Sequence, residues 1–406
     1  MYALSRLAPD VRQYLLITGN YWAFTLTDGA LRMLVVLHFH SLGYSPLAIA
    51  ALFLFYEIFG VVTNLLGGYL GARLGLNRTM NIGLGLQVAA LLMLTVPAVW
   101  LTIPWVMGAQ ALSGIAKDLN KMSAKSSIKL LVPNSQQGTL YKWVAILTGS
   151  KNALKGVGFF MGGALLALLG FGGAVLLMAA MLALIWLASL LLLKKDLGKA
   201  KAKPKFRDML SKSRAINLLS AARLFLFGAR DVWFVVALPV YLSSVLGWDV
   251  WQVGIFLAAW VIGYGIVQSF APAITGKASG QLPDGRAAFI WAALLAGLPA
   301  TIALGLHSDL SAQWVLLGGL MLFGVLFAVN SSLHSYLIVS YAKEDGVSLD
   351  VGFYYMSNAA GRLLGTLLSG WVYQAYGLEA CLWISSAFVL LAALISIGLP
   401  RHSRDC

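Results

Sequence analysis

Two stretches of this chain decide its fold: residues 150–170 read SKNALKGVGFFMGGALLALLG, and residues 357–377 read SNAAGRLLGTLLSGWVYQAYG. A shift of 207 positions superimposes a serine, a basic residue and three glycines of the first stretch on the same residue types in the second. The matched pairs are Ser150 with Ser357, Lys155 with Arg362, Gly158 with Gly365, Gly163 with Gly370, and Gly170 with Gly377. A shift of 210 adds a second set, in which Gly108, Gly114 and Asn120 fall on Gly318, Gly324 and Asn330. Because these offsets are about half of the 406-residue chain, the sequence predicts two related halves.

The composition excludes a soluble fold. Apolar residues make up 60% of the chain and charged residues only 11%, with a mean hydropathy of +0.82, whereas a soluble globular chain carries roughly 25% charged residues. A helix that crosses a bilayer needs about 20 mostly apolar residues, and such stretches recur between short polar or glycine- and proline-containing breaks. The first stretch is interrupted by Asp28 and Arg32, so we expect a permanent span and not a cleaved signal peptide.

We predict an all-α membrane protein with twelve transmembrane helices in two pseudo-symmetric six-helix halves. The N-terminal half, residues 1–193, has spans near 14–38, 46–70, 79–100, 104–128, 140–168 and 172–193. A basic linker, residues 194–214, leads to the C-terminal half, residues 215–406, with spans near 216–244, 250–275, 286–305, 312–339, 350–375 and 379–399. Duplicated halves are typical of secondary transporters, whose substrate sites lie near the bilayer midplane between the repeats.

Basic residues in the loops predict the orientation of the chain. They gather in every second loop, and the loops between carry none; the basic positions are Arg73, Arg78, Lys125, Lys129, Lys142, the nine of the linker, Lys277, Arg286 and Lys343. Because positively charged loops stay in the cytoplasm, we expect both termini there. The net charge of +14 then indicates contact with anionic lipid headgroups of the bilayer and not with nucleic acid.

The charged residues inside the predicted spans are the candidate functional residues. Eight are basic, namely Arg32, Lys117, Lys121, Lys151, Lys155, Arg223, Arg230 and Arg362. Four are acidic, namely Asp28, Glu57, Asp118 and Asp231. A Lys or Arg at the centre of a membrane helix costs about 2.5–3.5 kcal/mol on insertion scales, and such residues usually face a cavity and mark function. We expect Asp28 to pair with Arg32 and Asp231 with Arg230, while Arg223 and Lys117 are the best candidates for reaching the headgroups from helix ends.

Two interpretations compete for the remaining charge. Lys151 and Lys155 either pair with acids on other helices or line a solute cavity that stays positive until an anion arrives. Since eight cations face four acids, we favour the cavity and a compact, multiply charged anion. Arg32 and Arg230 occupy comparable places in the two halves, which predicts a guanidinium clamp for oxyanions. With Arg362 they would bind one set of oxygens, and the other set would be bound by Lys117, Lys121, Lys151 and Lys155.

Other polar residues of the spans allow two roles each. Glu57 is either a protonated core residue or an acid that carries a proton during transport. His334, with Asn330 and Tyr336 on the same predicted span, could bind solute or relay protons, although a buried histidine with a local partner is the commoner arrangement. We retain these three as candidate substrate-binding residues, and we retain as candidates for proton coupling or charge pairing Asp28, Glu57, Asp118 and Asp231.

Enzyme chemistry finds no support, since the sequence contains no HExxH, P-loop or nucleophile-elbow pattern. We therefore expect neither catalytic residues nor a cofactor. Cys381 and Cys406 lack CxxC spacing, so neither a disulfide nor a metal site is expected. A cation exporter would need surplus acids in the spans, the opposite of the observed balance. An organophosphate or sugar-phosphate antiporter stays open as an alternative, and a membrane solute sensor would be expected to carry an appended soluble domain.

Local motifs resemble a known superfamily of transporters. Gly68, Leu70, Arg73, Gly75 and Arg78 resemble the cytoplasmic signature loop of the major facilitator superfamily, in which an Asp usually precedes the Arg and Ala72 stands here. Four runs are similar to the ArsJ-type organoarsenical efflux permeases of bacterial arsenic-resistance operons: NYWAFTLTDGALRMLVVLHFHSLGYSP from residue 20, FLFYEIFGVVTN from 53, SGIAKDLNKMSAKSSIKLLVP from 113 and TGSKNALKGVGFF from 148. The likeness extends over essentially the whole chain.

That resemblance implies the superfamily fold and a specific solute. Such permeases export 1-arseno-3-phosphoglycerate, an unstable ester that glyceraldehyde-3-phosphate dehydrogenase makes from arsenate and glyceraldehyde 3-phosphate. The resemblance thus implies a functional link to that dehydrogenase and arsenate resistance. We expect a multi-pass monomer in the bacterial inner membrane. Two anionic heads on one ester suit two cationic clusters. Either proton antiport or voltage-driven uniport could power export, since outward movement of an anion gains about 2.3 kcal/mol per charge per 100 mV.

Overall fold

The computed structural model describes residues 8–44, 52–194, 197–201, 204–210, 212–276, 282–308 and 311–401. Throughout these ranges the regular structure is helical and no strand occurs. Lys277 and Cys406, which the sequence analysis singled out, lie outside the described residues.

The helices of the first half follow the predicted order. They are α1 (Pro9–Ser41), α3 (Leu54–Leu74), α4 (Leu76–Met93), α5 (Ile103–Leu131) and α6 (Gln137–Leu192), with a short 3₁₀ helix at Ala98–Trp100. Pro9 occupies the first turn of α1, where its missing N–H needs no helical acceptor. The span predicted to reach residue 100 ends at Met93, because Pro97 follows closely and the residue before a proline is disfavoured in a helix.

The second half contains α7 (Arg214–Phe234), α8 (Ala237–Ser244), α9 (Val250–Gly276), α10 (Gly285–Gly305), α11 (Ala312–Tyr341) and α12 (Val347–Ser396), preceded by a 3₁₀ turn at Phe206–Met209. Side-chain caps fix two of its helix starts. Ser213 accepts a hydrogen bond from the backbone N–H of Ile216, and Asp284 accepts from those of Arg286 and Ala287. Such caps satisfy backbone donors that have no partner within the helix.

Two glycines divide the longest helices. The backbone turns at Gly170 inside α6 (φ 67°) and at Gly377 inside α12 (φ 79°), so each of these elements is a pair of helices. Positive φ is cheap for glycine because it has no Cβ, and these are the positions that the 207-residue repeat superimposes. With α6 and α12 each counted as two spans and α7 with α8 as one, the described chain contains twelve helical spans in the predicted order. The predicted fold class is therefore confirmed.

Length and hydropathy agree with a membrane location for much of the described chain. The segments apolar and long enough to cross a membrane are Gln137–Leu192, Arg214–Ser244, Trp251–Thr275, Gly285–Gly305, Ala312–Tyr341 and Val347–Ser396. Large apolar side chains on their outer faces are exposed, among them Leu168, Leu191 and Trp371. In a bilayer this surface contacts lipid, where exposed apolar groups carry no penalty.

The chain forms two compact units. The first unit comprises Met1–Leu140, Ser150–Ser211 and Ala342–Met356, and the second unit comprises Tyr141–Gly149, Lys212–Tyr341 and Ser357–Cys406. Each unit thus takes most of one sequence half and a short segment of the other. The first turns of α12 belong with the N-terminal helices: Ser348 Oγ donates to the Gly68 carbonyl oxygen at 2.7 Å.

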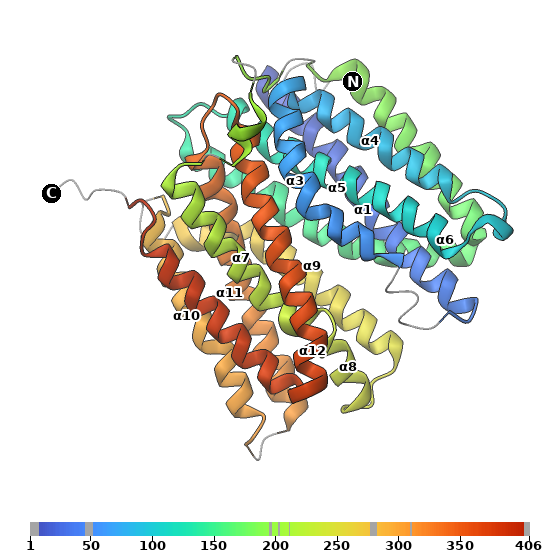
Figure 1. Ribbon diagram of the computed structural model, residues 1–406, viewed down its shortest axis with the longest axis vertical. Helices are drawn as coiled ribbons and strands as arrows, with labels where there is room; N and C mark the ends of the chain where they lie inside the picture. The colour runs from blue at the N-terminus through green and yellow to red at the C-terminus, as the bar shows by residue number, and fades with distance from the viewer. Residues whose placement is uncertain are drawn as a thin grey trace. The chain divides into compact units, whose positions relative to one another are not determined.

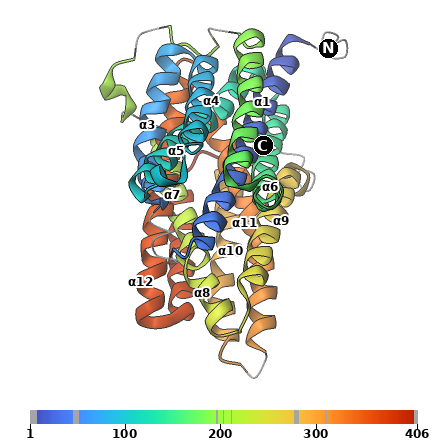
Figure 2. The same cartoon turned by 90° about the vertical axis from the view of Figure 1, so that its right-hand side faces the viewer.

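Within each unit, helices pack around a short set of central neighbours. In the first unit α5 packs against α1, α3 and α4, which Figure 1 shows as a bundle of adjacent helices. In the second unit α11 packs against α7, α9 and α10, and Figure 2 shows α9, α10 and α11 side by side. Among the described residues, the central helices α5 and α11 carry nine and five of the buried polar side chains of their units.

Glycines bring the first helix of each unit close to a repeat-related partner. A Cβ on Gly29 of α1 would lie 2.7 Å from the carbonyl oxygen of Lys155 on α6. A Cβ on Gly365 of α12 would lie 2.6 Å from the carbonyl oxygen of Gly228 on α7. These backbones touch because glycine leaves room for them, a common device where membrane helices cross. Both crossings lie within one turn of charged side chains.

Candidate functional site

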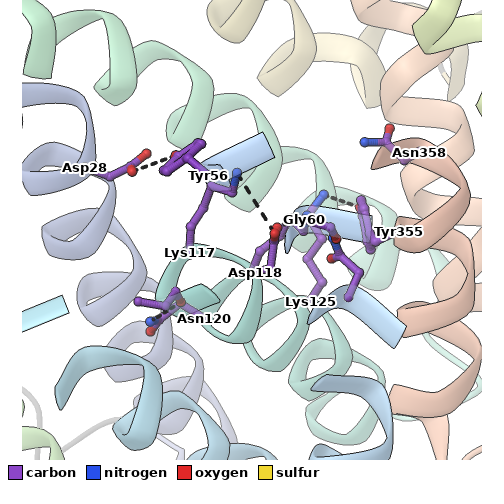
Figure 3. Close-up of polar contacts among 12 residues, drawn as sticks. Asp28, Tyr56, Gly60, Lys117, Asp118, Asn120, Lys125, Tyr355 and Asn358 are labelled. Atoms are coloured by element: carbon purple, nitrogen blue, oxygen red, sulfur yellow. Dashed lines mark hydrogen bonds and ion pairs between the residues drawn. The ribbon is translucent and has the colours of Figure 1, made fainter. Parts of the chain in front are cut away.

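Three lysines on α5 form the core of a charged cluster in the first unit. Lys117, Lys121 and Lys125 are spaced four residues apart, which places them along one face of the helix. Asp118 lies between them, 1% exposed, with Lys121 Nζ at 2.6 Å and Lys117 Nζ at 4.0 Å. Figure 3 shows the contact between Lys117 and Asp118. One buried carboxylate therefore serves two ammonium groups.

Tyrosine rings support the same three lysines. Lys117 Nζ lies 3.8 Å from the centroid of the Tyr56 ring, and the Tyr355 ring lies beneath Lys121 and Lys125 at 4.9 and 4.6 Å. Lys125 also donates a hydrogen bond to the Tyr355 hydroxyl (Figure 3). The face of an aromatic ring attracts a cation, by about 0.5–2 kcal/mol depending on solvation, so the rings offset part of the cost of burying these charges.

The cluster continues to α1, α3 and α6 through Asp28. Its carboxylate accepts a hydrogen bond from Tyr56 Oη at 2.7 Å and lies 3.8 Å from Lys155 Nζ. Figure 3 shows the Tyr56 hydroxyl directed at Asp28. We name the connected set the lysine cluster; its members are Asp28, Arg32, Tyr56, Glu57, Lys117, Asp118, Lys121, Lys125, Lys155 and Tyr355.

Arg32 departs from the expected pairing. The spacing of Asp28 and Arg32 predicted an ion pair along α1. In the structure Arg32 instead forms an ion pair with Glu57 of α3 at 3.6 Å, and its guanidinium lies 5.0 and 5.4 Å from the centroids of the Phe53 and Tyr56 rings. Residues of other helices take the place of the partner along α1: Glu57 of α3 contacts Arg32, and Lys155 of α6 contacts Asp28. Arg32 and Glu57 are each about 30% exposed, so this edge of the lysine cluster is accessible from outside the unit.

Lys151 lies one turn before Lys155 on α6. Its ammonium group donates to Asn152 Oδ1 at 3.3 Å, and the side chain is half-buried. Lys155 itself pairs with Asp28. The two lysines, which we predicted to act together, thus contact different partners: Asn152 for Lys151 and Asp28 for Lys155.

The second unit contains an arginine cluster around one carboxylate. Asp231 of α7 is fully buried, with Oδ1 at 2.5 Å from Arg230 Nη2 and Oδ2 accepting from Arg362 Nε at 3.0 Å. The predicted pair of Arg230 with Asp231 is confirmed, and Arg362 of α12 joins it. The Phe227, Phe327 and Phe234 rings lie 5.0–5.7 Å from the Arg230 guanidinium.

Arg223 extends this cluster and corrects an expectation. Arg223 and Lys117 were the best candidates, among the basic residues of the spans, for reaching the headgroups from helix ends. Arg223 is instead 3% exposed, donates to Asn358 Oδ1 at 2.8 Å and to the Ser331 carbonyl oxygen at 3.2 Å, and stacks 3.8 Å from the Phe227 ring. Lys117 lies over Tyr56 inside its unit. Both side chains point inward because they contact hydrogen-bond acceptors or aromatic rings inside their units. Hydropathy alone does not predict such contacts.

We name the connected set the arginine cluster; its members are Arg223, Phe227, Arg230, Asp231, Phe234, Phe327, Asn358 and Arg362. Among the residues that the structure describes, the arginine cluster holds three basic side chains and one acidic side chain. The lysine cluster holds five basic side chains and three acidic ones. Asp28, Asp118 and Asp231 are at most 7% exposed, whereas Arg32, Lys117, Lys121, Lys155, Arg230 and Arg362 are 14–32% exposed. The accessible part of each cluster is therefore mainly positive.

The three candidates on α11 have separate environments. Asn330 donates to the carbonyl oxygens of Trp291 and Leu326, both at 2.9 Å, and so ties α11 to α10. The Tyr336 ring lies 4.7 Å from that of Tyr141. His334 is fully buried, and neither ring nitrogen has a hydrogen-bond partner in the described part of the chain. A local partner for this histidine was the commoner expectation, and the structure does not provide one.

Sequence reasoning missed seven members of the clusters: Lys125, Tyr56, Tyr355, Asn358 and the rings of Phe227, Phe234 and Phe327. Lys125 had been counted with the loops, yet it is 3% exposed within α5. Its spacing of four from Lys121 was a signal that could have identified it. Tyr56, Tyr355 and Asn358 gave no such signal, because a tyrosine or an asparagine in a span is common and only packing shows which cation it contacts.

The described residues contain no group of three His, Cys, Asp or Glu side chains that could hold a metal ion. Cys381 is buried and free. The polar chemistry of both clusters is that of nitrogen donors, which suits oxyanions.

Comparison with known proteins decides the family. The model of the Major Facilitator Superfamily matches residues 15–282 and 224–405. The chain belongs to the Major Facilitator Superfamily. It is therefore a secondary transporter and not an enzyme, embedded in a membrane by many helices. A search of curated proteins gives no significant match.

Solved structures of superfamily transporters share the fold over nearly the entire chain. The human organic anion transporter TETRAN is 18% identical, with a TM-score of 0.74 and coverage of 96% of this chain and 100% of that one. A bacterial homologue of the iron transporter ferroportin, in an outward-facing state, is 16% identical, with a TM-score of 0.73 and coverage of 95% of this chain and 98% of that one. The fucose:proton symporter FucP of E. coli is 13% identical, with a TM-score of 0.75 and coverage of 97% of this chain and 100% of that one. At these identities the likeness shows the fold alone.

Proposed function

We propose that the protein exports an anionic ester with two oxyanion heads, 1-arseno-3-phosphoglycerate, and so confers resistance to arsenate. The observation that carries the proposal is the surplus of basic side chains in both clusters, with the three aspartates Asp28, Asp118 and Asp231 buried behind them. Glu57 is the one carboxylate of the two clusters with an exposure comparable to that of the cations. An approaching anion would meet ammonium and guanidinium groups first. Hydrogen bonds between such groups and phosphate-like oxygens are short and strong.

The solutes carried by the solved relatives do not indicate which substrate this protein transports. Proteins of this fold are described as carriers of an organic anion, of iron and of fucose, so the fold is compatible with very different solutes. The charge of the site is the better guide. A sugar needs neutral donors and acceptors and a metal ion needs acids or thiols, whereas both clusters here present surplus nitrogen cations.

Residue chemistry favours a pentavalent arsenic ester over arsenite. Trivalent arsenic seeks soft thiolate ligands, whereas arsenate is a hard phosphate mimic that nitrogen donors bind. Cys381 is the one cysteine in the described ranges, and it is 0% exposed within the apolar core of the second unit. The resemblance of the four sequence runs to ArsJ-type permeases points to the same ester.

In this proposal each cluster binds one head. Arg230 and Arg362, held in place by Asp231, present planar guanidinium groups suited to two-pronged contact with an oxyanion. Lys117, Lys121 and Lys155 present point charges, while Lys151 lies one turn from Lys155. A clamp made by Arg32 of the first unit and Arg230 of the second stays a prediction, as do the roles of Asn330, His334 and Tyr336.

Alternating access would move the ester outward. The two six-helix halves of such carriers rock about a central site, and bound anion would relieve repulsion among the cations. Both termini would lie in the cytoplasm of a bacterial cell, in keeping with the basic loops. Glyceraldehyde-3-phosphate dehydrogenase would supply the ester. Proton antiport through Glu57 or voltage-driven uniport would provide the energy.

Transport into everted membrane vesicles tests the proposal. The ester is generated in place from radiolabelled arsenate, glyceraldehyde 3-phosphate and the dehydrogenase, and accumulation of label inside is measured. We expect accumulation that depends on the dehydrogenase, and an excess of glycerol phosphate should compete weakly. Accumulation of labelled glycerol phosphate instead would favour the organophosphate antiporter, and accumulation of neither would contradict both assignments.

Site variants sharpen the same assay. Replacing Lys155 by Gln, or Arg230 by Gln, should lower uptake at least tenfold, since each removes a charge-assisted hydrogen bond. Lys142→Gln is the matched control, because Lys142 is an exposed basic residue of α6 in neither cluster. Full uptake by both cluster variants, at normal expression, would contradict the site.

A further inference from the structure

A groove in the first unit lies outside the lysine cluster. Its volume is about 480 Å³, and its lining residues are Asn77, Arg78, Asn81, Ile82, Trp186, Leu190 and Leu193. They come from the first turns of α4 and the last turns of α6. None belongs to either cluster, and the transport proposal gives the groove no role.

One end of the groove is polar and carries positive charge. Arg78 is exposed there, and no acidic residue is present in the lining. Asn77 Nδ2 donates to the Lys194 carbonyl oxygen at 2.8 Å, which holds the basic linker against the start of α4. The first turn of α4 carries no acidic side chain, and helix N-termini favour anions. The Leu76 N–H of this turn donates to the Leu197 carbonyl oxygen at 2.7 Å.

Trp186 contributes a hydrogen-bond donor that is not satisfied. Its indole ring packs over Gly85, where an added Cβ would lie 2.8 Å from the ring. The indole nitrogen is buried and has no acceptor among the described residues. Burying such a donor unpaired costs roughly 1–3 kcal/mol, so the lining of the groove supplies an N–H that favours an acceptor oxygen.

The rest of the groove is apolar and open to the outside of the unit. Ile82 and Leu190 are 43% and 44% exposed, and Leu191 beside them is 85% exposed. This surface lies on membrane-spanning helices at the end that carries the basic loops, where Arg73, Lys194 and Lys199 also lie. A bilayer places acyl chains against the apolar part and headgroups beside Arg78.

We propose that this groove is a binding site for a phospholipid with a net negative headgroup, such as phosphatidylglycerol or cardiolipin. The phosphate is bound by Arg78 and the start of α4, an ester or phosphate oxygen accepts the Trp186 N–H, and an acyl chain follows Ile82 and Leu190. Charge complementarity selects this occupant: a zwitterionic headgroup would bring a cation beside Arg78 with no acid in the lining to meet it.

Lipid retention on the purified full-length protein tests the site. The protein is equilibrated with equal amounts of phosphatidylglycerol and phosphatidylcholine of the same chains, and bound lipid is counted by native mass spectrometry. Arg78→Gln should reduce bound phosphatidylglycerol about fivefold, the equivalent of about 1 kcal/mol for one basic residue near a membrane surface. Trp186→Phe, which keeps the ring over Gly85 and removes only the N–H, should reduce it roughly threefold.

Arg73→Gln is the matched control. Arg73 is also an exposed arginine at this end of the unit, but it donates to the Tyr69 hydroxyl at 2.8 Å and does not line the groove. Its loss should change retention less than twofold. Equal losses of bound phosphatidylglycerol in the Arg73 and Arg78 variants would contradict a specific site and indicate diffuse charge attraction. Equal retention of both lipids by the native protein would overturn the preference for a negative headgroup. Displacement of the lipid by millimolar glycerol phosphate would show a free-phosphate site instead.

Discussion

The lysine cluster and the arginine cluster are built on the same backbone crossing with different chemistry. Lys155 and Arg362 are equivalent in the repeat, each lies one turn before a crossing glycine, and each contacts an aspartate on the first helix of its unit. The Lys155 to Asp28 distance is 3.8 Å, whereas Arg362 Nε lies 3.0 Å from Asp231. Duplication preserved the geometry while the cations diverged.

The difference between the two clusters shows how a buried guanidinium and a buried ammonium group are each stabilised inside a membrane protein. Two guanidinium groups converge on one fully buried carboxylate in the second unit, because a planar fork can share an aspartate from two sides. Ammonium groups make less directional contacts, and the first unit surrounds them with tyrosine rings and two aspartates. We infer that the arginine cluster is the more rigid and the lysine cluster the more adaptable.

The largest effect expected from this contrast is on stability. Asp231→Asn leaves two arginines around one neutral amide and should lower the free energy of unfolding by about 3 kcal/mol, the scale measured when a buried pair loses one partner. Asp28→Asn should cost about 1 kcal/mol, since Tyr56 can still donate to the amide oxygen and Lys155 is 18% exposed. Thermal unfolding in detergent micelles, followed by tryptophan fluorescence, measures both; equal losses would remove the claimed difference in rigidity.

An exchange of the two cations should have a smaller, asymmetric effect on transport. Arg362→Lys shortens the side chain and removes the fork that contacts Asp231, so we expect uptake into everted vesicles to fall about tenfold. Lys155→Arg keeps the charge at a site where the present contact is already 3.8 Å long, and uptake should stay within about twofold. If the lysine site proves the less tolerant of the two, the assignment of rigid and adaptable clusters is reversed.

The smallest expected effect concerns the aromatic rings. Double-mutant cycles compare Lys117→Met with Tyr56→Leu, and Arg230→Met with Phe234→Leu. Lys117 lies 3.8 Å from its ring and Arg230 lies 5.7 Å from Phe234, so we expect coupling energies of about 1 and about 0.5 kcal/mol. A larger coupling for the arginine pair would show that the rings matter more in the second unit than distance suggests.

The sequence predicted the helices well and the contacts poorly. Hydropathy and the repeat located most of the spans within a few residues, including the turns at Gly170 and Gly377, because span length and glycine conformation are local properties. The span predicted to end at residue 100 ends at Met93. The pairing of Arg230 with Asp231 was also predicted, since the two are neighbours in the chain. The pairing of Asp28 with Arg32 was wrong, because their partners come from other helices.

The amino-acid sequence by itself determined that this chain is helical, embedded in a membrane, duplicated and more basic than acidic inside its spans. These properties depend on composition and on periodicity along the chain. Only the tertiary structure decided that Lys125 is buried on Tyr355, that Arg223 points inward to Asn358, and that Arg362 shares Asp231 with Arg230. Those contacts join residues more than 100 positions apart, and helix packing brings them together at distances that no local pattern encodes.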